Sequence, residues 1–322
     1  MTNPIIAEVI RGAIVESRHR GAYAVSDASG KIIASAGDIA VPIYPRSAIK
    51  AFQCIPVIES GAAAAFGFND EEIALCCASH NGEAEHVRVA RSMLQKIGIP
   101  ETCYECGTHW PSHRNAANDI VRLSETPKDV HNNCSGKHAG MLALAKHWGV
   151  EVKGYVKPEH PVQRAIANAV AAICDCDLGT VPMGIDGCSV PTWAMPLRNL
   201  ALGFARLNAS ITGQRIIAAA RTHPFMIAGT GKFDTRVLQA IPRLFLKYGA
   251  EGVYCGSIPH AGLGFAVKCD DGAPRAVEVA TAAILAKLEV WTDEEIALLQ
   301  AFQHETLRNW CKIEVGDIRA AG

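Results

Sequence analysis

Strand-like sequence patterns lie at both ends of this chain, and helix-like patterns fill the long stretch between them. Residues 4–36 alternate apolar and polar side chains, are rich in β-branched residues and are interrupted by Ser26-Asp-Ala-Ser-Gly30, as is typical of a β-hairpin or meander. Strand patterns return at 252–257, 262–269 and 275–280. Because both ends contribute strands, we expect one antiparallel sheet assembled from the two termini.

The other periodic segments carry apolar residues at helical spacing and should flank that sheet. The expected architecture is an α/β (α+β) sandwich with a mostly helical middle section. No repeat, low-complexity tract or Gly/Ser linker marks a boundary, so we expect a single domain over residues 1–322. The predicted helices cover residues 47–66, 84–98, 136–148, 160–174, 199–206, 212–221, 281–290 and 293–304.

Composition excludes several classes of protein. Hydrophobic residues make up 49% and charged residues 20%, with a net charge of −1, so nothing favours nucleic acid or an anionic membrane as a partner. No apolar run approaches the length of a membrane span. Glu8, Arg11 and Glu16 interrupt the N-terminal apolar residues, so we expect no secretory signal. The 12 cysteines are then expected to be reduced thiols in a cytoplasmic protein.

The chain contains an S-x-x-K motif at Ser47 and Lys50, directly after a proline and at the start of a helix-compatible run. Residues i and i+3 share one face of a helix, so the amine can lie against the hydroxyl. A neutral lysine can accept the serine proton and make the oxygen a nucleophile. The motif therefore indicates acyl transfer by a Ser-Lys dyad, against the alternative of a capping serine followed by a solvated lysine.

A second serine motif follows at Ser79-His80-Asn81. It has the S-x-N form of the second motif in serine β-lactamases and penicillin-binding proteins, whose first motif is S-x-x-K. Their third motif, K-T-G, lies on a strand near the C-terminus. Here that triplet is missing, but Lys268 ends the strand-like stretch Gly262-Leu-Gly-Phe-Ala-Val-Lys268.

Longer motifs are distributed over essentially the whole chain. They are Arg46-Ser-Ala-Ile-Lys50, Ala78-Ser-His-Asn81, Cys106-Gly-Thr-His109-Trp-Pro, His131-Asn-Asn-Cys134-Ser-Gly-Lys137-His-Ala-Gly-Met-Leu, Gly184-Ile-Asp186-Gly-Cys188-Ser-Val-Pro-Thr and Ala228-Gly-Thr-Gly-Lys-Phe-Asp234. Together they resemble the rhizobial-type (class 3) L-asparaginases of the asparaginase II family. The resemblance implies a serine β-lactamase-like fold, hydrolysis of L-asparagine to L-aspartate and ammonia, and a homodimer.

The same resemblance implies the composition of the site. It pairs Ser47 with Lys50 in one dyad and Ser79 with Lys268 in a second. The second dyad either relays protons or makes Ser79 the true nucleophile, and the sequence does not decide between these two roles. The resemblance also makes Cys134, Lys137 and Cys188 a zinc site with one ion per chain, and places Asp186 next to the metal-bound water.

The residue types are chemically compatible with this metal site. Thiolates are good zinc ligands, and Cys134 and Lys137 at i, i+3 can meet on one helical turn. A lysine binds a metal only as the neutral amine, so metal and proton compete for its lone pair. Because serines already supply nucleophiles, we expect the zinc to hold the α-amino or α-carboxylate group of the substrate. The alternative is a buried cysteine pair and a surface lysine.

Several polar residues beside these motifs are candidates for substrate binding. Arg46 would suit a carboxylate, and Asn81 and Asn133 could bind a small polar substrate, with His80 orienting it. His109 and Cys255 are expected in the pocket wall. Cys103-x-x-Cys106-x-x-His109 also permits a metal or redox motif, although one unmatched C-x-x-C is a weak signal.

Two other functions remain open from the sequence. A β-lactam or peptide hydrolase would share the first two serine motifs, but the missing K-T-G triplet counts against it. A non-catalytic zinc-binding or amino-acid-binding protein would keep the fold without hydrolysing asparagine.

Overall fold

The computed structural model describes residues 2–321, which form two compact units, each assembled from separate stretches of the chain. The sheet unit consists of the residues up to Ala48, the segment Met195–Arg206 and the residues from Leu246 on. The helical unit consists of Ile49–Ala194 and Leu207–Phe245. The expectation of a single domain over residues 1–322 stays a prediction.

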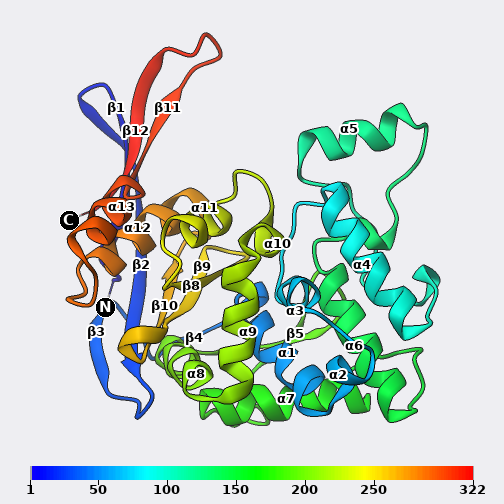
Figure 1. The fold of residues 1–322 in the computed structure, drawn as a ribbon. Helices are drawn as coiled ribbons and strands as arrows, with labels where there is room; N and C mark the ends of the chain where they lie inside the picture. Colours follow the sequence, from blue (N-terminus) through cyan, green and yellow to red (C-terminus); the bar gives the residue numbers. More distant parts are fainter. Residues whose placement is uncertain (1, 322) are drawn as a thin grey trace. The chain divides into compact units, whose positions relative to one another are not determined.

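The sheet unit is built on an eight-stranded sheet in the order β11-β12-β1-β2-β10-β9-β8, with β3 pairing β2 off this path (Figure 1). Strands from the two ends of the chain meet where β1 pairs with β12 and where β2 pairs with β10, both antiparallel. The predicted sheet built from both termini is therefore confirmed. Its strands are β1 (Ile5–Arg11), β2 (Ile14–Asp27), β3 (Ile32–Ala36), β8 (Phe245–Gly249), β9 (Val253–Ile258), β10 (Leu263–Cys269), β11 (His304–Arg308) and β12 (Glu314–Ala320).

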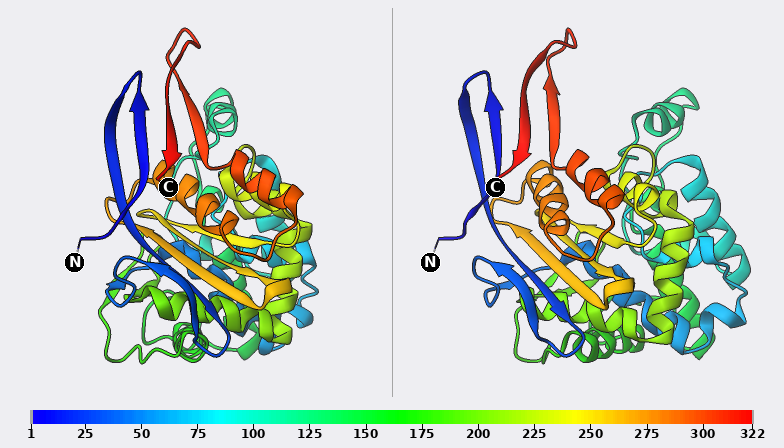
Figure 2. Two further views of the ribbon diagram at one scale, coloured as in Figure 1. Left: turned by 90° about the vertical axis from the view of Figure 1, so that its left-hand side faces the viewer. Right: turned by 60° about the vertical axis from the view of Figure 1, so that its left-hand side comes forward.

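Helices α12 (Pro274–Ala286) and α13 (Asp293–Ala301) belong to the same unit, and α12 packs on β1, β9, β10 and β12 (Figure 2). Helix α8 (Leu197–Ala209) follows a short ladder between β4 (Pro42–Ile43) and β7 (Met195–Pro196). The β1–β2 and β11–β12 hairpins extend side by side beyond α12 and α13 (Figures 1 and 2).

The strand predicted at 275–280 is wrong, because these residues lie in α12. The alternation Val277-Glu-Val279 resembles a strand over five residues, but Pro274 occupies the first turn of the helix, where its missing N–H costs nothing. Burial of nearly every residue from Ala276 to Leu285 shows that α12 is enclosed by the sheet and its neighbours. A short apolar run in such a helix cannot be told from a strand by its period alone.

The helical unit surrounds α6 (Ser135–Trp148), which contacts α1, α2, α3, α4 and α7. Its residues from Ser135 to Ala145 are all buried, so neighbouring elements cover this part of α6 on every side. The other elements are α1 (Lys50–Glu59), α2 (Ala62–Ala65), α3 (Asp70–Cys76), α4 (Ala84–Ile97), α5 (Arg114–Arg122), α7 (Pro161–Cys174), α9 (Ile211–Thr222), α10 (Pro224–Ala228), α11 (Phe233–Ala240) and the hairpin β5 (Met183–Ile185) with β6 (Pro191–Trp193).

The helices predicted at 84–98, 136–148, 160–174 and 212–221 are confirmed to within two residues at their starts and ends. The helix predicted at 47–66 is present in three pieces: a 3-10 turn at Arg46–Ile49, then α1 and α2. No helix in the described part of the chain is both long and apolar enough to cross a membrane.

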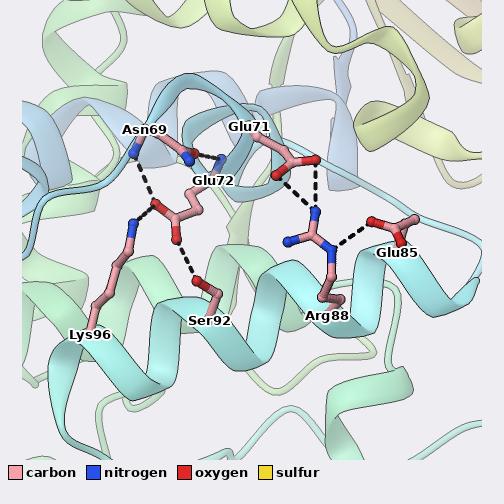
Figure 3. Close-up of polar contacts among 7 residues, drawn as sticks. All are labelled: Asn69, Glu71, Glu72, Glu85, Arg88, Ser92 and Lys96. Carbon is pink, nitrogen blue, oxygen red and sulfur yellow. Dashed lines mark hydrogen bonds and ion pairs between the residues drawn. The ribbon is translucent and has the colours of Figure 1, made fainter.

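A buried carboxylate joins α3 to α4 (Figure 3). Glu72 is 2% exposed and accepts hydrogen bonds from the Asn69 amide at 2.9 Å, the Lys96 amine at 2.7 Å and the Ser92 hydroxyl at 3.1 Å. Asn69 in turn caps α3 by accepting from the Glu72 amide, which completes a capping box. These contacts hold α3 against α4, and α3 ends at Cys76, three residues before Ser79.

Candidate active site

A buried lysine and a half-buried serine lie in contact at one end of α1. Lys50 is the first residue of α1 and is fully buried, and its amine donates to the Ala78 carbonyl and to Ser79 Oγ, the latter at 3.0 Å. The Ser79 amide donates to the Ile227 carbonyl at 2.9 Å, which anchors the serine after α3 ends. A buried amine beside a hydroxyl is the arrangement that general-base chemistry requires.

The other predicted catalytic residues lie in the sheet unit. Ser47 is half-buried within the 3-10 turn that precedes Lys50, and Arg46 has a positive φ of 52°. Such backbone strain concentrates at functional sites. Lys268 lies in β10, where its amine donates to the Glu251 carbonyl at 2.7 Å and to the Cys269 carbonyl. The dyads Ser47–Lys50 and Ser79–Lys268 stay predictions.

The three predicted zinc ligands come together in the helical unit. Cys134 directly precedes α6, Lys137 lies in its first turn, and Cys188 lies in the turn between β5 and β6. The Lys137 amine donates to Cys188 Sγ at 2.9 Å, and Cys134 Sγ donates to Asn133 Oδ1 at 3.0 Å. Each of the three residues is 4% exposed.

Two local backbone features make this convergence possible. Gly136 lets α6 approach α3, because a Cβ there would lie 2.3 Å from the Leu75 carbonyl oxygen. In the turn that carries Cys188, Asp186 exchanges backbone hydrogen bonds with Ser189 and Val190, and Ser189 has a positive φ of 74°. The helix start and the turn thus meet at a buried point.

The three side chains shift one another's pKa values. Interaction with the Cys188 side chain lowers the pKa of Cys134 well below its usual range, and Lys50 and Lys137 lower it further, against the opposing effect of burial. The same interaction raises the pKa of Cys188, and burial raises it further. Burial alone would lower the pKa of Lys137, but Cys188, Cys134 and Asp186 raise it above its ordinary value.

This donor set fits zinc. Two sulfurs and one nitrogen are enclosed by protein here, with Lys137 Nζ 2.9 Å from Cys188 Sγ. Sulfur and nitrogen are ligand atoms that zinc prefers, and three protein ligands leave one position open. Metal binding would require Cys188 and Lys137 to release their protons. Lys50, whose amine donates to Ser79 Oγ, also lowers the pKa of Cys134.

His80 is enclosed by protein groups. Its ring is 1% exposed, accepts from the Gly82 amide at Nδ1 (3.1 Å) and therefore donates from Nε2 to Ser135 Oγ (2.9 Å). The ring stacks on His86 with a centroid distance of 4.8 Å. Burial lowers the pKa of His80 well below its usual range, and His86 and Lys50 lower it further. These contacts support a role in holding Ser79 against α6; contact with substrate stays a prediction.

The predicted amide residues lie on either side of His80. Asn81 is 2% exposed and packs against Gly229. The φ of 101° and ψ of −174° at Gly229 suit glycine alone. A Cβ added there would lie 2.3 Å from the Asn81 amide oxygen. The Asn133 amide donates to His109 Nε2 at 2.8 Å, and the Asn133 carbonyl accepts from the His80 amide. The backbone of Asn133 therefore connects the His109 ring to the His80 amide.

The cysteines outside the zinc set have separate surroundings. Cys255 is fully buried in β9, and burial raises the pKa of its thiol. Cys106 donates to the Asp129 carbonyl at 3.5 Å, and burial raises its pKa to about 12. The placement of Cys106 and His109 in a pocket wall stays a prediction. The pocket role of Cys255 stays a prediction.

Comparison with known proteins identifies the family of this chain. The model of the family described as L-asparaginase II matches residues 7–320, nearly the whole chain. The chain belongs to the L-asparaginase II family. Membership confirms the resemblance recognised in the sequence and implies L-asparaginase activity (EC 3.5.1.1) on L-asparagine.

No curated protein matches the sequence of this L-asparaginase II family member. Among solved structures, it is similar to a β-lactamase from Mycobacterium bovis (13% identity, 88% of this chain and 94% of that one, TM-score 0.36). It is similar to a protein titled Mglu (15%, 85% and 69%, TM-score 0.35). A LovD6 mutant of the simvastatin synthase LovD from Aspergillus terreus is also similar (8%, 88% and 90%, TM-score 0.35).

One contact beside the site was not predicted from sequence. Glu83 accepts from the Thr230 amide and hydroxyl, both at 2.8 Å. Together with the Ser79–Ile227 and Asn81–Ala228 hydrogen bonds, it fastens the segment 79–83 along 227–230. The motif Ala228-Gly-Thr-Gly predicts a loop here, but Glu83, which binds that loop, is distant in the sequence.

A second unpredicted group lies in the sheet unit. The ligand atoms of His19, Cys269 and Asp271 lie within 4.8 Å of one another, so these side chains could hold a metal ion. The sequence signal is weak, because His19 is far from the other two and has no motif around it.

Proposed function

We propose that this L-asparaginase II family member hydrolyses the side-chain amide of L-asparagine by Ser-Lys nucleophilic catalysis, with a zinc ion held by Cys134, Lys137 and Cys188. The observation that carries the proposal is the fully buried Lys50 amine, 3.0 Å from Ser79 Oγ. Burial keeps water away from an amine that must exchange protons, and the neighbouring hydroxyl offers it a partner.

In the proposed reaction, Ser47 Oγ attacks the side-chain carbonyl carbon as its proton passes to neutral Lys50. Backbone amides near Ser47 stabilise the tetrahedral oxyanion. Lys50 then returns the proton through Ser79 to the departing nitrogen, which leaves as ammonia. Water attacks the resulting β-aspartyl ester, releases L-aspartate and restores the Ser47 hydroxyl. Lys268 pairs with Ser79 in this proposal as a further proton donor or acceptor.

The remaining residues bind the substrate. Arg46 pairs with its α-carboxylate, and Asn81 and Asn133 supply amide hydrogen bonds. Zinc bound at the Cys134 cluster would hold the α-amino or α-carboxylate group, with Asp186 beside the water in the open position. We also propose a homodimer on family grounds.

Ammonia release from asparagine and glutamine, measured side by side, tests the activity. Ser47→Ala is expected to lower turnover by about 10⁴-fold or more, since it removes the nucleophile, and Ser79→Ala by about 10²-fold, since it removes a proton relay. Mass spectrometry of trapped enzyme should find the acyl group on Ser47. Near-normal turnover of Ser47→Ala, or an acyl group on Ser79, would exclude Ser47 as the nucleophile.

The alternative functions have distinct outcomes in the same experiment. Hydrolysis of a chromogenic β-lactam without ammonia release from asparagine would indicate a penicillin-recognising hydrolase. Asparagine binding without any hydrolysis would indicate a binding protein that keeps the fold.

A further inference from the structure

The cluster of His19, Cys269 and Asp271 lies where two central strands end. His19 is on β2, and Cys269 is the last residue of β10, paired in register with Gly21. Because side chains alternate between the faces of a strand, His19 and Cys269 are on the same face of the sheet. Asp271 follows in the turn between β10 and α12.

The three side chains are in direct contact. Asp271 Oδ2 is 2.6 Å from His19 Nδ1, and Asp271 Oδ1 accepts from Cys269 Sγ at 2.9 Å and from the Ala273 amide at 3.1 Å. His19 and Cys269 are buried at 5% and 0% exposure, whereas the Asp271 side chain is 49% exposed. The cluster is therefore enclosed on the protein side and accessible through its carboxylate.

One polar atom in the cluster has no partner. His19 Nε2 is buried without a hydrogen bond. A buried ring nitrogen without a partner costs free energy, so a purely hydrogen-bonded triad leaves His19 incompletely satisfied.

The donor set selects a class of ion. Imidazole nitrogen, thiolate sulfur and carboxylate oxygen together suit zinc and similar divalent transition metals, whereas magnesium and calcium prefer oxygen alone. Burial and Asp271 raise the pKa of Cys269 to about 12, so without an ion the thiol keeps its proton. Partial burial alone would raise the pKa of Asp271, but its hydrogen bonds lower it to about 2, so the carboxylate is charged at neutral pH.

We propose that His19, Cys269 and Asp271 form a second divalent metal site of the zinc type, with water as its fourth ligand. The site is separate from the Cys134 cluster. Binding displaces the thiol proton to solvent and takes His19 as the neutral imidazole. The ion fastens β2 to the turn after β10, and so holds the strand end that carries Lys268, whose amine already donates to the Cys269 carbonyl.

Metal titration of the full chain tests the site. Metal-free protein is titrated with Co²⁺, bound metal is counted by mass spectrometry, and the sulfur-to-cobalt charge-transfer band is recorded. The background carries Cys134→Ser and Cys188→Ser, which silence the other thiolate cluster. We expect one equivalent of Co²⁺ with a thiolate band, displaced by Zn²⁺.

Substitution of each proposed ligand tests which side chains bind the metal. Cys269→Ser should abolish the charge-transfer band, and Asp271→Asn, on an exposed side chain, should weaken Co²⁺ binding by about tenfold or more. Cys311→Ser is the matched control, because this exposed thiol is in the sheet unit but outside the cluster. An unchanged band and stoichiometry in Cys269→Ser would overturn the proposal. Should that variant fail to fold, unchanged Co²⁺ affinity in Asp271→Asn and His19→Gln would overturn it equally.

Discussion

Glu71 and Glu72 are neighbouring carboxylates in the first turn of α3, and their replacement by glutamine should have very different effects. Glu72→Gln keeps the volume of the side chain but turns one acceptor oxygen into an NH₂ group. That group would face donors, because Glu72 accepts from the Asn69 amide, the Ser92 hydroxyl and the Lys96 amine (Figure 3). Glu71 instead pairs with Arg88 near the surface.

The magnitudes follow from exposure. Removing one partner of a buried ion pair costs about 3–5 kcal/mol, and each hydrogen bond to a charged group contributes about 1.5–3 kcal/mol. Lys96 is 33% exposed and also donates to the Gly67 carbonyl, so water and this carbonyl recover part of the loss. We therefore expect Glu72→Gln to lower the free energy of unfolding by about 2–3 kcal/mol. The Glu71–Arg88 pair is 26% and 54% exposed, so Glu71→Gln should cost at most about 1 kcal/mol.

Urea unfolding of the wild type and both variants, followed by circular dichroism, measures these free energies. Turnover at a temperature where all three are folded should change little, because Glu72 contacts none of the proposed catalytic side chains in the described hydrogen bonds. A Glu72→Gln variant within about 0.5 kcal/mol of wild type, or an equal loss in Glu71→Gln, would refute the reasoning from burial.

Three further predictions concern the site. Burial lowers the pKa of both His80 and His86 in the folded state. The stability that they contribute is therefore present above about pH 6.5 and lost as pH falls below it. The free energy of unfolding should be lower at about pH 5.5 than at about pH 7.5, and equal values would contradict this. Gly229→Ala should lower stability by about 1–3 kcal/mol, measured by urea unfolding, because the new methyl group would meet the Asn81 amide, and a neutral outcome would place that loop elsewhere. Removal of zinc by a chelator should raise KM for asparagine more than it lowers kcat, since the ion is proposed to bind substrate; loss of kcat to the uncatalysed level with the fold intact would refute that role.

Local patterns determined much of the fold. The alternation in residues 4–36 and the helical spacing at 84–98 and 136–148 predicted the elements found there, because each pattern places its apolar residues on one face or buries them all around. The same reasoning failed at 275–280, where a helix start and a short alternating run carry the same apolar residues. The sequence did not predict strands β11 and β12, because they are largely exposed or half-exposed and β12 pairs with β1 at the other end of the chain.

For the site, the sequence by itself determined which residues to examine: the S-x-x-K and S-x-N motifs named Ser47, Lys50 and Ser79, and family motifs named the Cys134 cluster. Only the tertiary structure decided which of these groups touch. It placed the Lys50 amine on Ser79, brought Lys137 to Cys188, and gathered His19, Cys269 and Asp271, which no motif connects. The physical reason is that motif spacing reports contacts within one helix or strand, whereas these contacts depend on how separate elements pack, which no local pattern encodes.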